Sequence, residues 1–136
     1  AAAPAAALEG RRAEVCGAAV DALSALPASP PAPALATLDA ILAADPESAL
    51  PHMSALVSAL CRAAEAAPRA RGRAAALRCL LRIARLPYVH LHPHRPGVLV
   101  LLRRAVDDRK RPVRQLAAAA RNEWMVLDAG GGDAGA

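Results

Sequence analysis

Segments of this sequence recur at an interval of about 40 residues, and that interval constrains the fold more than any other feature. Three pairs of segments share it, at offsets of 39, 42 and 41 residues: LDAIL (38–42) with LRCLL (77–81), PHMSALVSAL (51–60) with PHRPGVLVLL (93–102), and Gly72-Arg73 with Val113-Arg114. Such an interval, with two helices in each unit, is typical of HEAT and armadillo repeats. We therefore expect helical hairpins that stack side by side into a solenoid.

Composition supports a helical chain. Alanine and leucine, the strongest helix formers, are abundant, whereas aromatic residues make up only 1% of the sequence and strand-favouring residues are scarce. Prolines and polar turns divide the chain, so we predict helices over residues 8–25, 34–44, 47–66, 70–86, 93–106 and 111–127. The intervening loops are predicted at 25–35, 45–48, 67–72, 86–97 and 107–112.

The predicted fold class is therefore all-α, an α-solenoid of about three HEAT-type helical hairpins with a C-terminal capping helix. Residues 1–128 form this unit, and residues 129–136, rich in glycine and alanine, form a tail that we expect to be disordered. In the final helix, one face is apolar at steps of three and four residues, from Val113 to Trp124. We expect Trp124 to pack in the core or at the end of the solenoid rather than at an interface.

The stretch VDDRKRPVR (106–114) is predicted to be a turn between repeats. Asp107 or Asp108 is expected to cap the following helix by accepting backbone N–H bonds, and Val113 is expected to anchor that helix in the core. Arg114 is expected to bond acids or carbonyl groups of a neighbouring repeat.

Three consecutive cations in the same turn, Arg109, Lys110 and Arg111, have no structural role that the repeat pattern supplies. They lie in the most basic part of the chain, since residues 62–121 carry 15 cations against 3 acids. Such a concentration of charge favours an acidic protein surface or phosphates as a partner. Two interpretations stay open: a solvated turn, or a contact surface formed by these three residues with Arg114.

Several motifs at the C-terminal side carry a family resemblance. They are ALRCL, RLP before a loop, HPHRPGVL, an acidic pair before KRPVR, and ARNEW followed by an apolar stretch and a glycine-rich end, all within about residues 70–130. In this order and spacing they resemble the C-terminal HEAT repeats of the MMS-nineteen family. VHLHPH departs from that pattern, because the family has aliphatic residues and a tyrosine where this chain has histidines.

The resemblance implies a function. Members of this family are non-catalytic adaptors of the cytosolic iron–sulfur cluster targeting complex, labelled as DNA repair and transcription proteins, and act in the cytoplasm and the nucleus. The resemblance implies that this chain docks other subunits of that complex and, through them, iron–sulfur apo-proteins of DNA replication and repair. Neither a cofactor nor a membrane is expected. The alternative is a generic HEAT-repeat module that binds a protein or a nucleic acid through its basic face.

Rival chemistries have weaker support. Direct nucleic-acid binding is less well supported, because Tyr88 and Trp124 are the only aromatic residues in the sequence on which bases could stack. His90, His92 and His94 have a spacing that can ligate zinc or nickel, but no cysteine or carboxylate is near them in sequence. The cysteines, Cys16, Cys61 and Cys79, lack a cluster-binding motif, and we expect reduced thiols in an intracellular protein. Nucleophile elbows and phosphate-binding loops are missing from the sequence, so we expect no catalysis.

Overall fold

The computed structural model describes residues 14–21 and 32–127. Within these ranges the chain is all-α, with no strand, as the composition predicts. After a helical segment at residues 14–21 come α2 (Ala32–Ala44), the 3-10 helix η1 (Pro46–His52), α3 (Met53–Ala66), α4 (Ala70–Ile83), α5 (Tyr88–Leu91), α6 (Arg95–Ala105) and α7 (Arg111–Met125).

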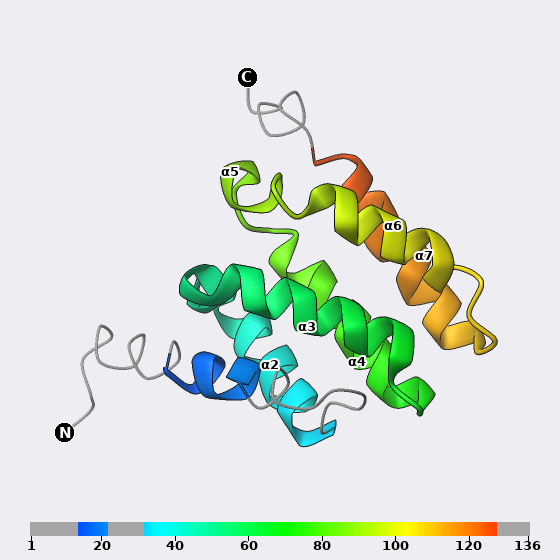
Figure 1. The fold of residues 1–136 in the computed structure, drawn as a ribbon, viewed down its shortest axis with the longest axis horizontal. Helices are drawn as coiled ribbons and strands as arrows, with labels where there is room; N and C mark the ends of the chain where they lie inside the picture. Colours follow the sequence, from blue (N-terminus) through cyan, green and yellow to red (C-terminus); the bar gives the residue numbers. More distant parts are fainter. Residues whose placement is uncertain (1–13, 22–31, 128–136) are drawn as a thin grey trace.

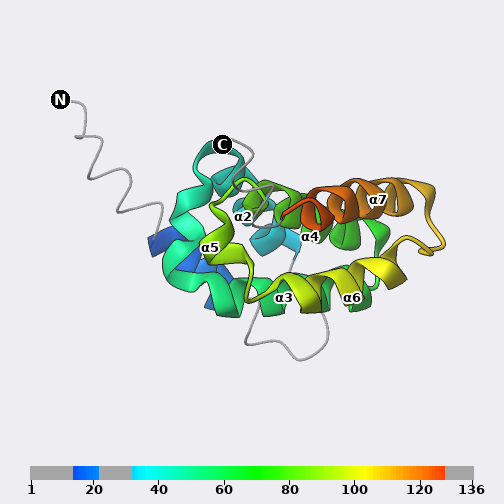
Figure 2. The same cartoon turned by 90° about the horizontal axis from the view of Figure 1, so that it is seen from above.

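The helices lie in two layers, best seen in Figure 2. One layer contains α2, α4 and α7, each packed against the next, and the other contains α3 and α6 side by side. Helix α3 also packs on α4, and α6 packs on α7, so that each pair forms an antiparallel hairpin (Figure 1). Stacked hairpins of this kind make an α-solenoid, and the predicted fold class is confirmed.

The repeat interval is correct, but the predicted position of the repeat boundary is wrong. The offsets pair α2 with α4, α3 with α6 and α4 with α7, which are neighbours within a layer. The turn at residues 106–110, however, joins α6 to α7 within one hairpin, while residues 84–94, including α5, lead from one hairpin to the next. An interval alone does not reveal which two helices of a repeat pack together. The predicted capping helix is α7, which is also the second helix of the last described hairpin.

Prolines explain three further differences from the predicted helices. The helix expected over residues 47–66 is divided into η1 and α3, because Pro51 has no N–H to donate in a helix interior. Helix α2 starts earlier than expected, at Ala32, since Pro33 is tolerated in a first turn. The loop predicted at 86–97 contains the short helix α5, which follows Pro87. The predicted tail at 129–136 lies outside the described residues.

Apolar side chains from every long helix form one continuous core. The largest fully buried side chains are Leu35, Leu38, Leu42, Leu56, Leu60, Leu77, Leu80, Ile83, Leu91, Leu102 and Trp124. Full burial of one such aliphatic side chain contributes about 2 kcal/mol. The longer side chains make most of the packing contacts. The buried alanines, which include Ala63, Ala76, Ala117 and Ala120, have short side chains that fill little of the space between neighbouring helices.

Gly17 marks a close approach at the N-terminal side of this core. A Cβ atom at this position would lie 2.8 Å from Cε1 of His52, closer than two side chains can pack. The helical segment at residues 14–21 therefore sits against η1 at a point that only glycine fits without a shift of the imidazole ring.

Candidate docking site at the turn between α6 and α7

The turn that carries the predicted site is short and tightly bonded to the helix before it. Helix α6 ends at Ala105, and the N–H groups of Asp107 and Asp108 donate to the carbonyl oxygens of Arg104 and Ala105, at 3.1 and 3.0 Å. Helix α7 then begins at Arg111, so only three residues lie between Asp107 and the new helix. The backbone of the turn is thus set by the end of α6.

Asp108 is bound to the preceding hairpin through Arg73 of α4. Arg73 Nε donates to Asp108 Oδ2 at 2.8 Å, and Arg73 Nη2 donates to Oδ1 at 3.2 Å. The pair is largely hidden from solvent, with side-chain exposures of 6% for Arg73 and 11% for Asp108. Arg73 Nη1 also donates to the carbonyl oxygen of Ala67, at 2.9 Å. This one guanidinium therefore connects the α3–α4 turn, helix α4 and the α6–α7 turn.

Opposing effects act on the pKa of the Asp108 carboxyl. Burial raises it, because removal from water disfavours the charged form. The hydrogen bonds from Arg73 and from the Lys110 N–H, with the positive charges of Arg73 and Arg109, lower it and together prevail. The net result is a pKa below the usual aspartate range, so Asp108 is ionised at neutral pH.

The prediction that Asp107 or Asp108 caps α7 is wrong. The residue at the cap position is Lys110, and no side chain caps the first turn. Asp108 Oδ1 instead accepts the Lys110 N–H at 2.9 Å, one residue before the helix starts. Pro112 occupies the second position of the helix and has no N–H to offer a cap. Asp107 is exposed.

Val113 and Trp124 fix α7 to the core, as the sequence predicts. Both side chains have no exposed surface. The Trp124 Nε1–H donates to the carbonyl oxygen of Leu80 at 3.0 Å, which joins the end of α7 to α4. Trp124 thus belongs to the packing between hairpins.

Arg95, which the sequence does not single out, completes the other end of this hairpin. Its Nε donates to the Trp124 carbonyl oxygen at 2.9 Å, and its Nη2 donates to that of Met125 at 2.8 Å. Carbonyl groups at the end of a helix lack intrahelical partners, and a cation there is favourable. No signal in the sequence points to Arg95, whereas Arg73 is detectable because it aligns with Arg114 in the repeat.

The four residues predicted to bind a partner lie together, and their side chains are exposed. Within residues 14–21 and 32–127, the side chains of Arg109, Lys110 and Arg111 form no ion pair. We call these three residues the basic turn. Arg114 Nη1 donates to the carbonyl oxygen of Asp108 at 2.9 Å, so the expected bond to a carbonyl is made within its own hairpin and not to a neighbour.

The α3–α4 turn lies beside the α6–α7 turn and widens the exposed edge. A shallow depression of about 350 Å³ between them is lined by residues of both turns, including Glu65, Pro68, Arg73, Asp108 and Arg109. The exposed Arg69 belongs to the same α3–α4 turn. The buried Arg73–Asp108 pair holds the two turns together at the base of this depression.

The histidines and cysteines occupy separate places. His90 and His92 are exposed, and the rings of Tyr88 and His92 lie 5.5 Å apart between centroids. In the described part of the chain, no group of three or more histidines, cysteines and carboxylates is arranged so that it could hold a metal ion. Burial raises the pKa of the Cys16 and Cys61 thiols to about 11 and that of Cys79 to about 12, so all three thiols are protonated at neutral pH.

Comparison with known proteins supports the resemblance predicted from the motifs. The chain is 35% identical over 97 residues to the MMS19 nucleotide excision repair protein homologs of Bos taurus and of Homo sapiens. It is 45% identical over 65 residues to the homolog of Danio rerio. These matches cover 71%, 71% and 48% of this chain, which spans only 9%, 9% and 6% of the length of the three relatives. No protein-family model matches the chain.

None of the helices in residues 14–21 and 32–127 has both the length and the apolar character that a membrane crossing needs.

Proposed function

From the confirmed similarity of this chain to a part of the MMS19 nucleotide excision repair proteins, we propose that it is a non-catalytic HEAT-repeat scaffold. Its partners are subunits of the cytosolic iron–sulfur cluster targeting complex and, through them, iron–sulfur apo-proteins of DNA replication and repair. It acts in the cytoplasm and the nucleus. The single observation that carries the proposal is the 35% identity over 97 residues, 71% of the chain.

The basic turn and Arg114 are the proposed docking residues. The support is their combination of a fixed backbone with exposed side chains. The buried Arg73–Asp108 pair attaches the turn to the preceding hairpin, so little backbone entropy remains to be lost when a partner binds. The side chains of Arg109, Lys110 and Arg111 are exposed, and they form no ion pair within the described residues.

The chemistry of the partner surface follows from these charges. Guanidinium groups bind carboxylates with paired hydrogen bonds, and clustered cations accelerate association with an acidic surface. We therefore expect an acidic patch on the partner subunit, and an affinity that falls as salt rises because the contacts lie at an exposed rim.

Co-elution tests this proposal directly. The 136-residue chain is mixed with the separate subunits of the targeting complex and passed over a size-exclusion column. We expect co-elution with at least one subunit, and we expect it to be lost when Arg109, Lys110 and Arg111 are all changed to glutamate. A matched control reverses three exposed cations elsewhere, Arg62, Arg103 and Arg121. The control variant should still co-elute, and circular dichroism should show the same helicity for all three proteins.

Two outcomes would contradict the proposal. Failure of the unmodified chain to co-elute with any subunit removes the docking function. Equal loss for both triple variants removes the assignment to the basic turn, because general charge would then explain the binding. Tight binding to duplex or single-stranded DNA with no subunit bound would favour the alternative of a basic module for nucleic acids.

A further inference from the structure

A second basic surface runs along α4, on the side of the molecule formed by α2, α4 and α7. Arg71, Arg78 and Arg82 lie in this helix, and Arg85 follows its last residue by two positions. Their spacing of seven, four and three residues places them on one helix face, over about 20 Å at 1.5 Å per residue. We call these four residues the arginine stripe.

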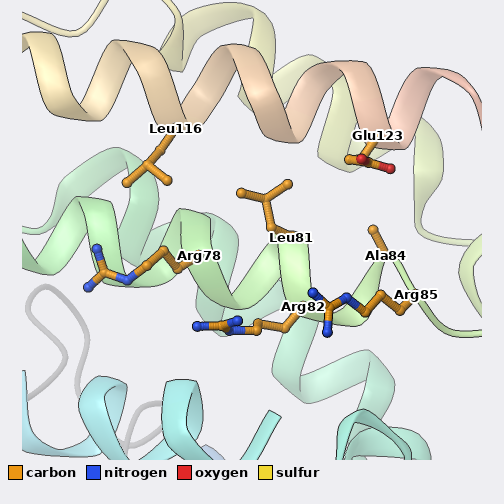
Figure 3. A pocket seen from close by; sticks show the side chains of 7 residues that line it. All are labelled: Arg78, Leu81, Arg82, Ala84, Arg85, Leu116 and Glu123. Atoms are coloured by element: carbon orange, nitrogen blue, oxygen red, sulfur yellow. The ribbon is translucent and has the colours of Figure 1, made fainter. Parts of the chain in front are cut away.

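Grooves flank the arginine stripe on both sides. The groove between α2 and α4 has a volume of about 420 Å³, and Leu35, Asp39 and Arg71 are among its lining residues. The groove between α4 and α7 has a volume of about 360 Å³, and Arg78, Leu81, Arg82, Ala84, Arg85, Leu116 and Glu123 line it (Figure 3). Arg78 and Arg82 border both grooves, so the stripe forms the ridge between them.

Asp39 of α2 already shows how the stripe binds a carboxylate. Arg82 Nε donates to Asp39 Oδ1 at 3.0 Å, and Arg78 Nε lies 3.4 Å from Oδ2. One carboxylate is thus shared between two guanidiniums four residues apart, which leaves a positive charge in excess. Arg71 and Arg85, at the two ends of the stripe, are exposed and form no ion pair within the described residues.

The groove between α4 and α7 adds an apolar contact to this charge. Leu81 and Leu116 are half-buried and point toward one another between the two helices, while the three arginines line the side of α4 nearer to α2 (Figure 3). A row of cations beside a leucine-lined groove is complementary to a helix that has acidic and apolar residues on one face.

We propose that the arginine stripe and the groove between α4 and α7 bind an acidic amphipathic helix of a partner protein. Its carboxylates pair with Arg71 and Arg85 in the way that Asp39 pairs with Arg78 and Arg82, and an apolar side chain lies on Leu81 and Leu116. The surface is separate from the basic turn, so this inference does not depend on the docking function proposed above.

Phosphates fit the same surface less well. The carboxylates of Asp39 and Glu123 line the grooves and repel phosphate oxygens. The lining residues include no aromatic side chain on which a base could stack. An acidic helix avoids both problems because its own charges can be spaced to lie over the four arginines.

Fluorescence anisotropy tests the proposal with a defined probe. The probe is a labelled helical peptide of about 18 residues, long enough to cover the stripe, with glutamates four and seven residues apart and leucines on the same face. Arg71→Gln with Arg85→Gln removes two charges that support no ion pair, so the fold should be unaffected. The matched control, Arg62→Gln with Arg103→Gln, removes two exposed charges from α3 and α6.

We expect the first double variant to weaken peptide binding at least about tenfold and the control to weaken it less than about twofold. A second peptide has the same composition, but its glutamates are spread around the helix. It should bind the unmodified chain as weakly as the original probe binds the first double variant. The proposal is overturned if the probe does not bind the chain, or if the two double variants weaken probe binding equally. It is also overturned if single-stranded or duplex DNA binds more tightly than the peptide and this DNA binding is lost in the variant that changes Arg71 and Arg85.

Discussion

The two described hairpins place an arginine at the same position, with different results. Arg73 and Arg114 are each the fourth residue of the second helix of their hairpin. In each, Nη1 donates to the carbonyl oxygen six residues earlier, that of Ala67 or of Asp108, at 2.9 Å. Arg73 is 5% exposed and also bonds the Asp108 carboxylate, whereas Arg114 is exposed and makes no such ion pair.

This difference separates local from tertiary causes. The bond to the earlier carbonyl depends only on the shape of the turn and recurs in both hairpins. Burial and the ion pair depend on the neighbouring hairpin, which covers Arg73 and supplies Asp108. The same residue type at the same repeat position is therefore part of the core in one hairpin and part of the surface in the other.

Among substitutions that test this comparison, Trp124→Ala should lower the free energy of unfolding most, because Trp124 packs the second hairpin against α4. Loss of a fully buried tryptophan costs about 3–5 kcal/mol in the free energy of unfolding, measured by urea denaturation. Trp124→Phe keeps most of the apolar volume and loses the N–H bond, and should cost about 1 kcal/mol. Equal destabilisation by the two variants would show that the hydrogen bond, and not the packing, dominates.

Arg73→Met should come next, with a loss of about 3 kcal/mol, because it leaves the carboxylate of Asp108 largely buried without its partner. In the double variant with Asp108→Leu, part of this loss should be recovered, since no unpaired charge remains. Urea denaturation of the four proteins gives the coupling free energy. Additive effects would contradict a direct interaction.

A smaller effect is expected from pH, which should change the contribution of the Arg73–Asp108 pair to the free energy of unfolding. The pKa of Asp108 is lowered in the folded chain, so its contribution is complete above the pKa of an unfolded aspartate, about 4. The contribution is lost as the pH falls through the lower, folded value. The gap in unfolding free energy between the unmodified chain and Arg73→Met should therefore narrow on acidification. A gap that stays constant down to about pH 2 would contradict the role of the ionised Asp108.

Arg114→Met should have the smallest effect, no more than about 0.5 kcal/mol, because an exposed side chain loses one hydrogen bond that water replaces. The measurement is the same urea denaturation, and Arg73→Met is its direct comparator. A loss as large as that of Arg73→Met would mean that the carbonyl bond shared by both arginines carries the stability.

Much of the fold was accessible from the sequence because it depends on local patterns. Periodicity located the helices, and the repeat interval paired α2 with α4 and α3 with α6. Exposure of Arg109 and Lys110 also followed, because the repeat gives them no buried partner.

Other features depend on contacts between residues distant in sequence. The partner of Asp108 is 35 residues away, in another hairpin, and a capping role was the nearest explanation available from the sequence alone. The boundary between repeats, the division of a helix near Pro51 and the bonds of Arg95 to the end of α7 likewise depend on how the hairpins pack.

The burial of Trp124 has an optical consequence. The chain contains one tryptophan, one tyrosine and no phenylalanine, so its ultraviolet-excited emission comes almost entirely from an indole at the junction of α4 and α7. That indole is shielded from water and bonded to a carbonyl oxygen, and its emission should be blue-shifted in the folded chain. Separation of the last hairpin from the rest would move this emission to the red without any attached dye, so the molecule carries its own spectroscopic sensor of solenoid integrity.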